Sequence, residues 1–291
     1  MDPALTSSLP AEPENAARPM PGRIHGQWDS MAECWGLHGS PLRPGEDDVR
    51  LYQRVVDELA GCGGMQRAVI LGVTPELYHL RWPADMELRA IDRSADMIGR
   101  VWPGREHEVV RGDWTEDHFP EGSVQLVLCD GGLHLLEYPV GQADLFRGVA
   151  AMLSRGGVAV FRLFLPPAVP VGPEEVLRKL RGGEVPDMNT LKLLLGHALT
   201  DSTREGVVLG RVWDCLHEGI GGDRDAFFGG LGWPAEEVAV IDFYRDSCAR
   251  YHFSTLEEVR ELMEDEFHVR GVVAAEHPMG QQCVHLQLER R

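Results

Sequence analysis

Apolar segments of strand length recur at regular intervals through the middle of the chain, and they constrain the fold more than any other feature. They lie at 68–71, 88–91, 108–110, 124–129 and 158–165. Short, continuously apolar runs are typical of strands that are buried on both faces of a sheet. Helix-starting patterns separate them, as in Thr74-Pro75-Glu76 and Ser94-Ala95-Asp96. This alternation predicts parallel strands with helices on both faces of the sheet.

The end of the chain has a different pattern. Ser254 with Glu257, or Thr255 with Glu258, has the spacing of a capping box before an apolar helix. Two strand-like segments follow, at 269–275 and 283–288, separated by a Pro-Met-Gly turn. We therefore predict an α/β fold: a doubly wound, Rossmann-like, mostly parallel sheet of seven strands that ends in an antiparallel hairpin.

The remaining segments suggest how the chain is divided. Residues 1–22 are rich in Pro, Ala, Glu and Ser, which predicts a disordered tail. Apolar positions at helical spacing between residues 166 and 254 predict a helical insert after the fifth strand, either a lid over the binding crevice or a packing elaboration. The expected units are a tail (1–22), an N-terminal helical segment (23–64), a sheet core (65–165), a helical insert or lid (166–254), and a final helix with the hairpin (255–291).

Composition limits the possible partners and the location. The formal net charge of −18 disfavours binding to nucleic acid or to anionic membranes. The six cysteines contain no C-x-x-C pair and the histidines lack metal-binding spacing, so no metal site is expected. No secretion signal or apolar stretch of about 20 residues is evident. These observations favour a cytoplasmic protein with reduced thiols and a small-molecule partner, and they leave the oligomeric state open.

A glycine or an aspartate stands at the end of four of the predicted strands, at intervals close to one strand-helix unit. These residues are Gly72, Asp92, Asp113 and Asp130. The carboxyl ends of parallel strands meet at one rim of a doubly wound sheet, where ligands bind. A carboxylate after the second strand suits the two hydroxyls of a ribose, and a carboxylate beside an aromatic ring suits an adenine. A helix cap or a turn is the competing interpretation of each aspartate.

Taken together, these motifs resemble the class I S-adenosylmethionine-dependent methyltransferase family over residues 67–165 and the closing hairpin, roughly half of the chain. The segments that carry the resemblance are "AVILGVTPEL", "RAIDRS", "RGDW", "VQLVLCDGGLHLL" and "LSRGGVAVFRL". The segment "WDSMAECWGLHGSPLRP" is similar to a subgroup in which a Trp-bearing segment folds over the cofactor and a helical insert follows the fifth strand. One departure stands out: the first motif keeps only Gly72, followed by Val73, Thr74 and Pro75.

The resemblance implies S-adenosylmethionine as the cofactor, with Arg43 a candidate for binding its carboxylate. The implied cofactor-binding residues are Trp35, Arg43, Gly72, Val73, Thr74, Asp92, Arg93, Met97, Gly112, Asp113, Trp114, Asp130 and Gly131.

The predicted activity is transfer of a methyl group to a small-molecule acceptor, achieved largely by proximity and orientation. His134, after the fourth strand, is the candidate catalytic base. A predicted helix within the segment "IDFYRDSCARYHF" carries polar side chains that could face the pocket: Asp242, Tyr244, Arg245, Tyr251 and His252. Of these, Tyr244, Arg245 and His252 are the candidate substrate-binding residues. Aromatic residues in the insert suit an apolar or aromatic acceptor.

Three other functions remain open at this point. The glycine-poor first motif also fits a non-catalytic binding protein on the same fold. A protein methyltransferase would use the insert to dock its partner. An NAD-dependent oxidoreductase is disfavoured, because G-x-G-x-x-G does not follow the first strand.

Overall fold

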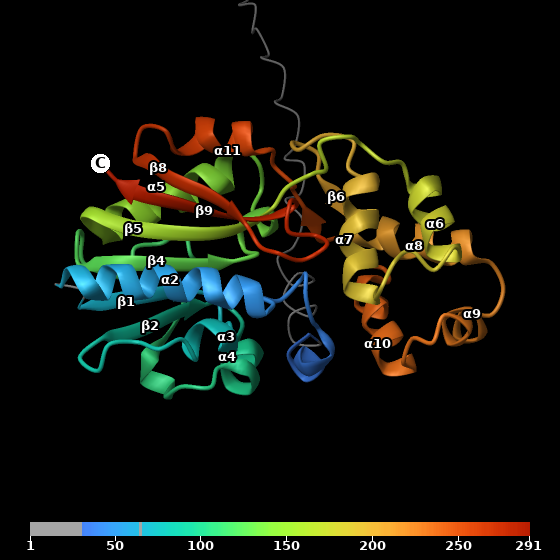
Figure 1. The fold of residues 1–291 in the computed structure, drawn as a ribbon, viewed down its shortest axis with the longest axis horizontal. Helices are drawn as coiled ribbons and strands as arrows, with labels where there is room; N and C mark the ends of the chain where they lie inside the picture. Colours follow the sequence, from blue (N-terminus) through green and yellow to red (C-terminus); the bar gives the residue numbers. More distant parts are fainter. Residues whose placement is uncertain (1–30, 64–65) are drawn as a thin grey trace, which may run out of the picture.

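The computed structural model describes residues 31–63 and 66–291, so the tail expected over residues 1–22 lies outside the described part. A sheet with strand order β3-β2-β1-β4-β5-β9-β8 forms the centre of the molecule (Figure 1). Its strands are β1 Arg67–Leu71, β2 Glu87–Asp92, β3 Val109–Arg111, β4 Val124–Asp130, β5 Leu153–Phe164, β8 Phe267–Ala274 and β9 Cys283–Arg290. β1 to β5 pair in parallel, and β9 runs antiparallel to both β5 and β8. The predicted fold class is therefore confirmed.

Alternate residues of the strands face two separate apolar layers. In β1, Val69 and Leu71 face a layer with α5 (Val140–Met152) and α11 (Leu256–Met263). Ala68 and Ile70 face the opposite layer, formed with α2 (Glu46–Cys62), α3 (Pro75–Tyr78) and α4 (Ala95–Val101). Both faces of the sheet are thus buried, which leaves the strand ends as the accessible part.

Local capping sets the starts of several helices. The Ser94 hydroxyl accepts a hydrogen bond from the Met97 amide at the start of α4. Thr255 and Glu258 form the reciprocal bonds of the predicted capping box at α11. Thr74 occupies the N-cap position of α3 without a side-chain bond, and this helix has only four residues.

The insert forms a helical unit beyond the ends of the parallel strands, drawn to the right of the sheet in Figure 1. Its elements are α6 Pro173–Arg181, α7 Met188–Ala198, β6 Val207–Val208, α8 Leu209–Ile220, α9 Arg224–Gly230, α10 Ala235–Ala239, the 3₁₀ helix η4 Val240–Tyr244 and β7 Arg250–Tyr251. It has its own apolar core, which includes Phe164 at the end of β5. None of the helices in the described ranges is long and apolar enough to cross a membrane.

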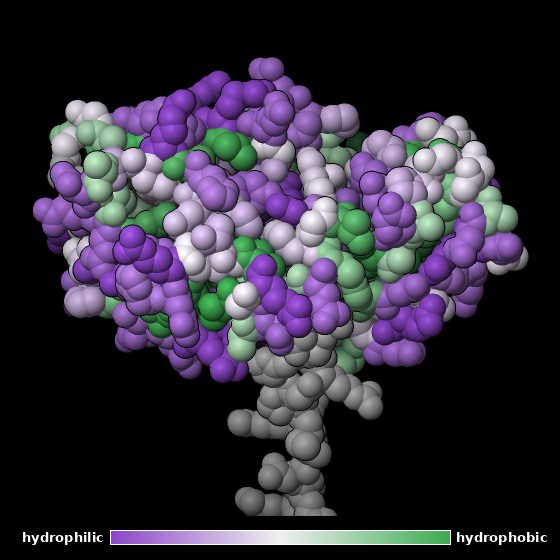
Figure 2. Space-filling model, turned by 90° about the horizontal axis from the view of Figure 1, so that it is seen from below, coloured by the Kyte–Doolittle hydropathy of each residue, from purple (hydrophilic) through white to green (hydrophobic). Residues whose placement is uncertain are grey.

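The helix expected within "IDFYRDSCARYHF" is wrong for most of its length. Only the short η4 forms, and the chain then extends into β7, which pairs antiparallel with β6. Asp246 has a φ of 54°, a left-handed conformation that ends helical geometry. Figure 2 shows a largely hydrophilic face, with apolar residues visible along the junction between the sheet and the insert.

Candidate functional site

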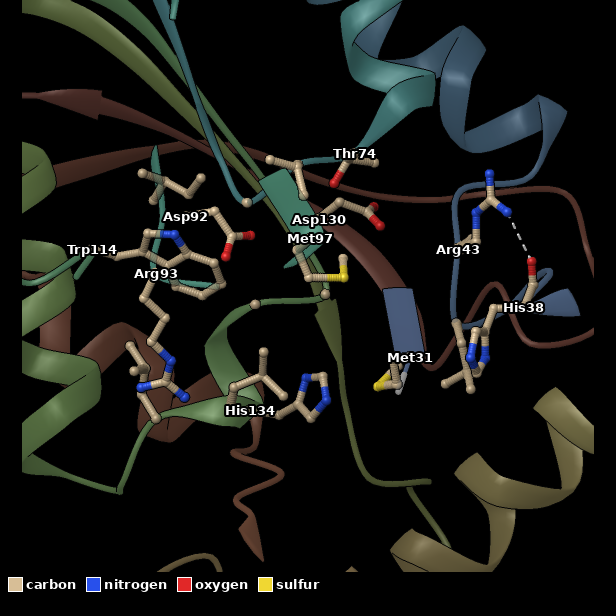
Figure 3. A pocket seen from close by; sticks show the side chains of 18 of the residues that line it. Met31, His38, Arg43, Thr74, Asp92, Arg93, Met97, Trp114, Asp130 and His134 are labelled. Carbon is tan, nitrogen blue, oxygen red and sulfur yellow. Dashed lines mark hydrogen bonds between the residues drawn. The ribbon is translucent and has the colours of Figure 1, made fainter. Parts of the chain in front are cut away.

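A cavity lies at the carboxyl ends of β1, β2 and β4, between the N-terminal segment and the insert (Figure 3). It encloses about 1090 Å³ of empty space, counted out to the solvent at its mouth. Every residue predicted to bind the cofactor lines it, and so do His134 and Tyr244. The lining residues that sequence reasoning missed are Met31, His38, Leu42, Leu71, Gly132, Leu135, Leu136, Phe164 and Lys192.

The structure does not bring Arg245 or His252 to this cavity. The Arg245 guanidinium lies 4.7 Å from the centre of the Trp213 ring and pairs with Asp242. The His252 ring is buried, with Nδ1 2.9 Å from the Thr203 carbonyl oxygen. Tyr251 lines the cavity instead of His252, because neighbouring side chains of extended backbone point in opposite directions.

Asp92 ends β2 as a buried carboxylate in the cavity wall. It is 9% exposed, and its Oδ1 accepts a hydrogen bond of 2.8 Å from the Ser94 amide. Burial raises the pKa of this carboxyl to about 6, against the lowering effect of the backbone amides of Ser94, Val73 and Arg93. The group is therefore largely ionised at neutral pH, and it presents an acceptor to a ligand in the cavity.

Gly72 makes the turn after β1, where a side chain has little room. Its φ is +93°, and a Cβ there would lie 3.4 Å from Cζ2 of Trp114. The Trp114 indole is held in place by a hydrogen bond of 2.8 Å from Nε1 to the Ile91 carbonyl. Gly132 approaches the same indole, since a Cβ there would lie 2.9 Å from Cζ3. The two glycines thus allow the indole to lie close against the backbone at the cavity wall.

Asp113 combines a local bond with a position in the cavity wall. Its Oδ1 accepts hydrogen bonds from the Thr115 amide (3.0 Å) and hydroxyl (2.8 Å), a turn-stabilising pattern. Its Oδ2 lies 3.9 Å from the Arg93 guanidinium. The turn interpretation of Asp113 is therefore correct, and it coexists with the lining position.

Asp130 lies in the cavity wall, but its carboxylate is fully engaged by Arg162. The Arg162 Nε donates to Oδ1 at 2.5 Å and the second amino group donates to Oδ2 at 2.9 Å. The Tyr52 hydroxyl donates to Oδ1 as well, at 3.1 Å. Arg162 is fully buried and also donates to the Pro41 carbonyl at 2.7 Å. Because both carboxylate oxygens already accept hydrogen bonds from the protein, this arrangement fits a structural role for Asp130 better than direct cofactor binding.

The same cluster extends to α2 and β9. Asp48 lies 3.9 Å from Arg162 and 3.0 Å from Nε2 of His285. The hydrogen bond from His285 and the charge of Arg162 lower the pKa of Asp48, although burial opposes them and is the largest single effect. Sequence reasoning missed this cluster of charged residues. The sequence feature that could have indicated it is a charged residue, Arg162, inside the apolar segment 158–165.

Arg43 connects the N-terminal segment to the sheet core by hydrogen bonds. One of its amino groups donates to the carbonyls of Trp35 (2.9 Å) and His38 (3.1 Å), the latter drawn as a dashed line in Figure 3. The other donates to Glu76 of α3 at 2.5 Å. Its guanidinium also lies 4.9 Å from the centre of the Trp35 ring. The sequence predicted that Arg43 lies at the cavity, but it did not predict the ion pair between Arg43 and Glu76.

His134 lies at the turn after β4, in an aromatic environment. Its ring stacks on Phe253 at 5.4 Å and meets the edge of Tyr251 at 4.5 Å. Burial lowers its pKa to about 3, and nearby His197, Arg162 and His252 add to this effect. The imidazole is therefore neutral at physiological pH and is a weak proton acceptor.

The insert contributes an unexpected cation to the cavity. Lys192 of α7 is 3% exposed, and its Nζ lies 4.8 Å from the centre of the Tyr244 ring. Burial lowers the pKa of this amine to about 7. The apolar run 191–199 had indicated only a packed helix, and a single lysine within it is a weak signal.

Comparison with known proteins identifies the fold and nothing finer. No family model and no curated protein matches the chain. A solved structure from Rhodobacter sphaeroides, provisionally named a Zn-dependent alcohol dehydrogenase, matches with a TM-score of 0.61 at 13% identity. The match covers 94% of this chain and 100% of that chain. At this identity it shows a shared fold alone.

Two further solved structures match with TM-scores of 0.49. They are the N-methyltransferase NodS from Bradyrhizobium japonicum WM9 with bound S-adenosyl-L-homocysteine, and magnesium protoporphyrin IX methyltransferase from Synechocystis with the same ligand. Identity is 11% and 13%; the matches cover 91% and 92% of this chain and 98% of each of the others.

Within residues 31–63 and 66–291, no three His, Cys, Asp or Glu side chains are grouped so as to hold a metal ion.

Proposed function

We propose that this protein is an S-adenosylmethionine-dependent methyltransferase that acts on a small molecule. The observation that carries the proposal is Asp92, a buried carboxylate at the end of β2, beside the Gly72 turn after β1. In doubly wound sheets, ligands bind where the strand order reverses, and here that point lies between β1 and β4. The cavity with Asp92 and Gly72 lies at this point.

The lining residues suit the parts of this cofactor. Asp92 would accept hydrogen bonds from the ribose hydroxyls, because its carboxylate is ionised and faces the cavity. Met97 and the fixed indole of Trp114 offer apolar surface for an adenine, with Asp113 nearby as an acceptor. The positive φ of Gly72 lets the backbone approach a ligand without a side chain in the way.

When bound, the cofactor would supply a methyl group already activated by a positively charged sulfur. The protein would contribute mainly by holding the acceptor in line with that methyl group. The insert and the N-terminal segment contribute side chains to the cavity, among them Lys192, Tyr244, Trp35 and His38, which reduce access of water to the acceptor. With a pKa of about 3, His134 would position the acceptor as a neutral ring rather than remove a proton.

Binding without turnover is the second candidate, and the first motif favours it. Pro75 removes an amide donor after the Gly72 turn, and α3 is only four residues long. Arg43, the candidate for the cofactor carboxylate, is already paired with Glu76. A protein that held the cofactor loosely, or held a related nucleoside, would have these features.

Calorimetric titration with S-adenosylmethionine and S-adenosylhomocysteine tests the proposal. Asp92→Asn should weaken binding by about ten- to a hundredfold, because hydrogen bonds to a charged group contribute about 1.5–3 kcal/mol. Asp96→Asn is the matched control, since Asp96 lies in the first turn of α4, the helix that follows Asp92, and its side chain is 47% exposed and does not line the cavity. Equal binding by both variants would contradict the ribose assignment.

Turnover separates the two candidates. The wild-type protein is incubated with methyl-labelled S-adenosylmethionine and a panel of small aromatic and apolar acceptors. Label in a small-molecule product supports the methyltransferase. Tight binding of both ligands without transfer to any acceptor favours the binding protein, and transfer only to added proteins favours a protein methyltransferase. Binding of neither ligand contradicts the proposed cofactor.

A further inference from the structure

Lys192 is a buried cation in the insert side of the cavity. Its side chain is 3% exposed and belongs to the cavity lining. Lysine is otherwise found in this chain only at Lys179, although Lys and Arg together number 28. A buried ammonium is costly unless an anion pairs with it. The cavity position of this rare side chain therefore needs a physical explanation.

The described part of the chain supplies no carboxylate within ion-pair distance of Lys192. The Lys192 Nζ lies instead over the face of the Tyr244 ring, 4.8 Å from the ring centre. The titratable groups that face it from the neighbouring elements are also not anions. His38 is neutral, since burial, Lys192 and Arg43 lower its pKa to about 3. Burial raises the pKa of Tyr244 well above its usual value. The surroundings of Lys192 thus favour a negative charge, and none of the residues at 31–63 and 66–291 provides one within ion-pair distance.

Aromatic rings surround this end of the cavity. The His134 ring lies 4.9 Å from the Phe164 ring and 4.5 Å from the Tyr251 ring, measured between centroids. All three line the cavity together with Tyr244 and Lys192. Flat apolar walls suit a planar ring, which stacks or packs edge-on against them. A cation among such walls adds a single polar anchor point.

We propose that the insert side of the cavity receives an aromatic acceptor that bears one acidic oxygen, as in a phenol or a carboxylic acid, and that Lys192 pairs with its anionic form. This inference rests on the proposed function, because it names the substrate class of the same site.

The protonation balance is simple. A phenol gives its proton to the neutral Lys192 amine, and this leaves a phenolate beside an ammonium. A carboxylate, already ionised in water, meets the ammonium form directly. Because burial lowers the pKa of Lys192 to about 7, both forms of the amine are available at neutral pH. Lys192 is a better partner than Arg43, whose charge is already paired with Glu76.

The test compares acids with neutral molecules of the same shape. The probes are 4-nitrophenol against 4-nitroanisole, and 4-nitrobenzoate against methyl 4-nitrobenzoate, each titrated with and without S-adenosylhomocysteine. In the wild-type protein at least one acid should bind tenfold or more tightly than its neutral counterpart. Bound 4-nitrophenol should also show phenolate absorbance at a lower pH than the free probe. Preference for the phenol or for the carboxylate identifies the acidic group.

Variants assign the effect to Lys192. Lys192→Met should abolish the preference for the acid and the absorbance shift, and Lys192→Arg should restore part of the binding preference. Lys179→Met is the matched control and should behave as the wild type. Lys192→Met should fold, because Met has a similar length and removes a buried amine that no carboxylate of the described residues pairs with.

The two proposals fail separately. Binding of S-adenosylhomocysteine without any preference for either acid overturns the acidic-acceptor inference and leaves the methyltransferase proposal intact. A Lys192-dependent preference for an acid without binding of S-adenosylhomocysteine overturns the cofactor and keeps the acid site. An acid preference that is unchanged in Lys192→Met also overturns the inference.

Discussion

Replacing Arg162 by Met tests the buried charge cluster beneath the cavity. Arg162 has no exposed side-chain surface and makes two hydrogen bonds to Asp130 and one to the Pro41 carbonyl. The substitution removes the cation but leaves Asp130 and Asp48 buried. Removing one partner of a buried ion pair costs about 3–5 kcal/mol, because the remaining charge has lost its compensation. We expect a loss of about this size in the free energy of unfolding.

The pH dependence gives this prediction a second, independent readout. Arg162 helps to hold the pKa of Asp48 below its usual value. A lowered carboxyl pKa contributes stability above the unfolded pKa of about 4, and that stability is lost as the pH falls through the folded pKa. Without Arg162 this contribution shrinks. The difference between wild type and Arg162→Met should therefore be larger at pH 7 than at pH 4.

Chemical unfolding followed by circular dichroism, at both pH values, measures these differences. The double variant Arg162→Met/Asp130→Asn should be less destabilised than the sum of the two single variants, because Asn removes the uncompensated charge. Arg178→Met is the control: its side chain is 58% exposed in a surface pair with Glu175, and solvent screens such pairs, so a far smaller loss than for Arg162→Met is expected. A loss of less than about 1 kcal/mol for Arg162→Met, or additive effects in the double variant, would refute the reasoning.

The remaining predictions concern single positions. Gly72→Ala should cost about 1–3 kcal/mol and weaken ligand binding, because φ is +93° and Trp114 is close; thermal unfolding and titration test this. Between pH 6.5 and pH 5 the wild type should lose about 1.5 kcal/mol more stability than His134→Phe, because a lowered histidine pKa makes protonation favour unfolding; an equal pH dependence would contradict this. Lys192→Met should be more stable than the wild type below pH 7, with a gain that fades toward pH 10, since its lowered pKa favours the unfolded state while the amine is charged. Thr255→Ala should cost about 1 kcal/mol by loss of the helix cap, and an unchanged midpoint in denaturant would contradict that.

Much of the fold and of the cavity rim was predictable, because both depend on local patterns. Continuous apolar segments alternate with helix-starting residues. This alternation predicts that the strands are parallel, whichever of them are neighbours in the sheet. The residue that follows each strand then lies at the same edge of the sheet. For this reason Gly72, Asp92, Asp113 and Asp130 could be brought together from their spacing alone, and all four line the cavity.

Tertiary structure alone decided which charged side chains pair with each other. Arg43 meets Glu76 across 33 positions of the chain, and Arg162 meets Asp130 across 32. No periodicity links such residues, because the reach of a long side chain depends on how separate elements pack. The same applies to Lys192, which occupies an ordinary position in a helix and becomes distinctive only because α7 buries it in the cavity wall. Strand and helix patterns follow from the chemistry of neighbouring residues, whereas the electrostatics of the site follow from distant segments that only the folded chain brings together.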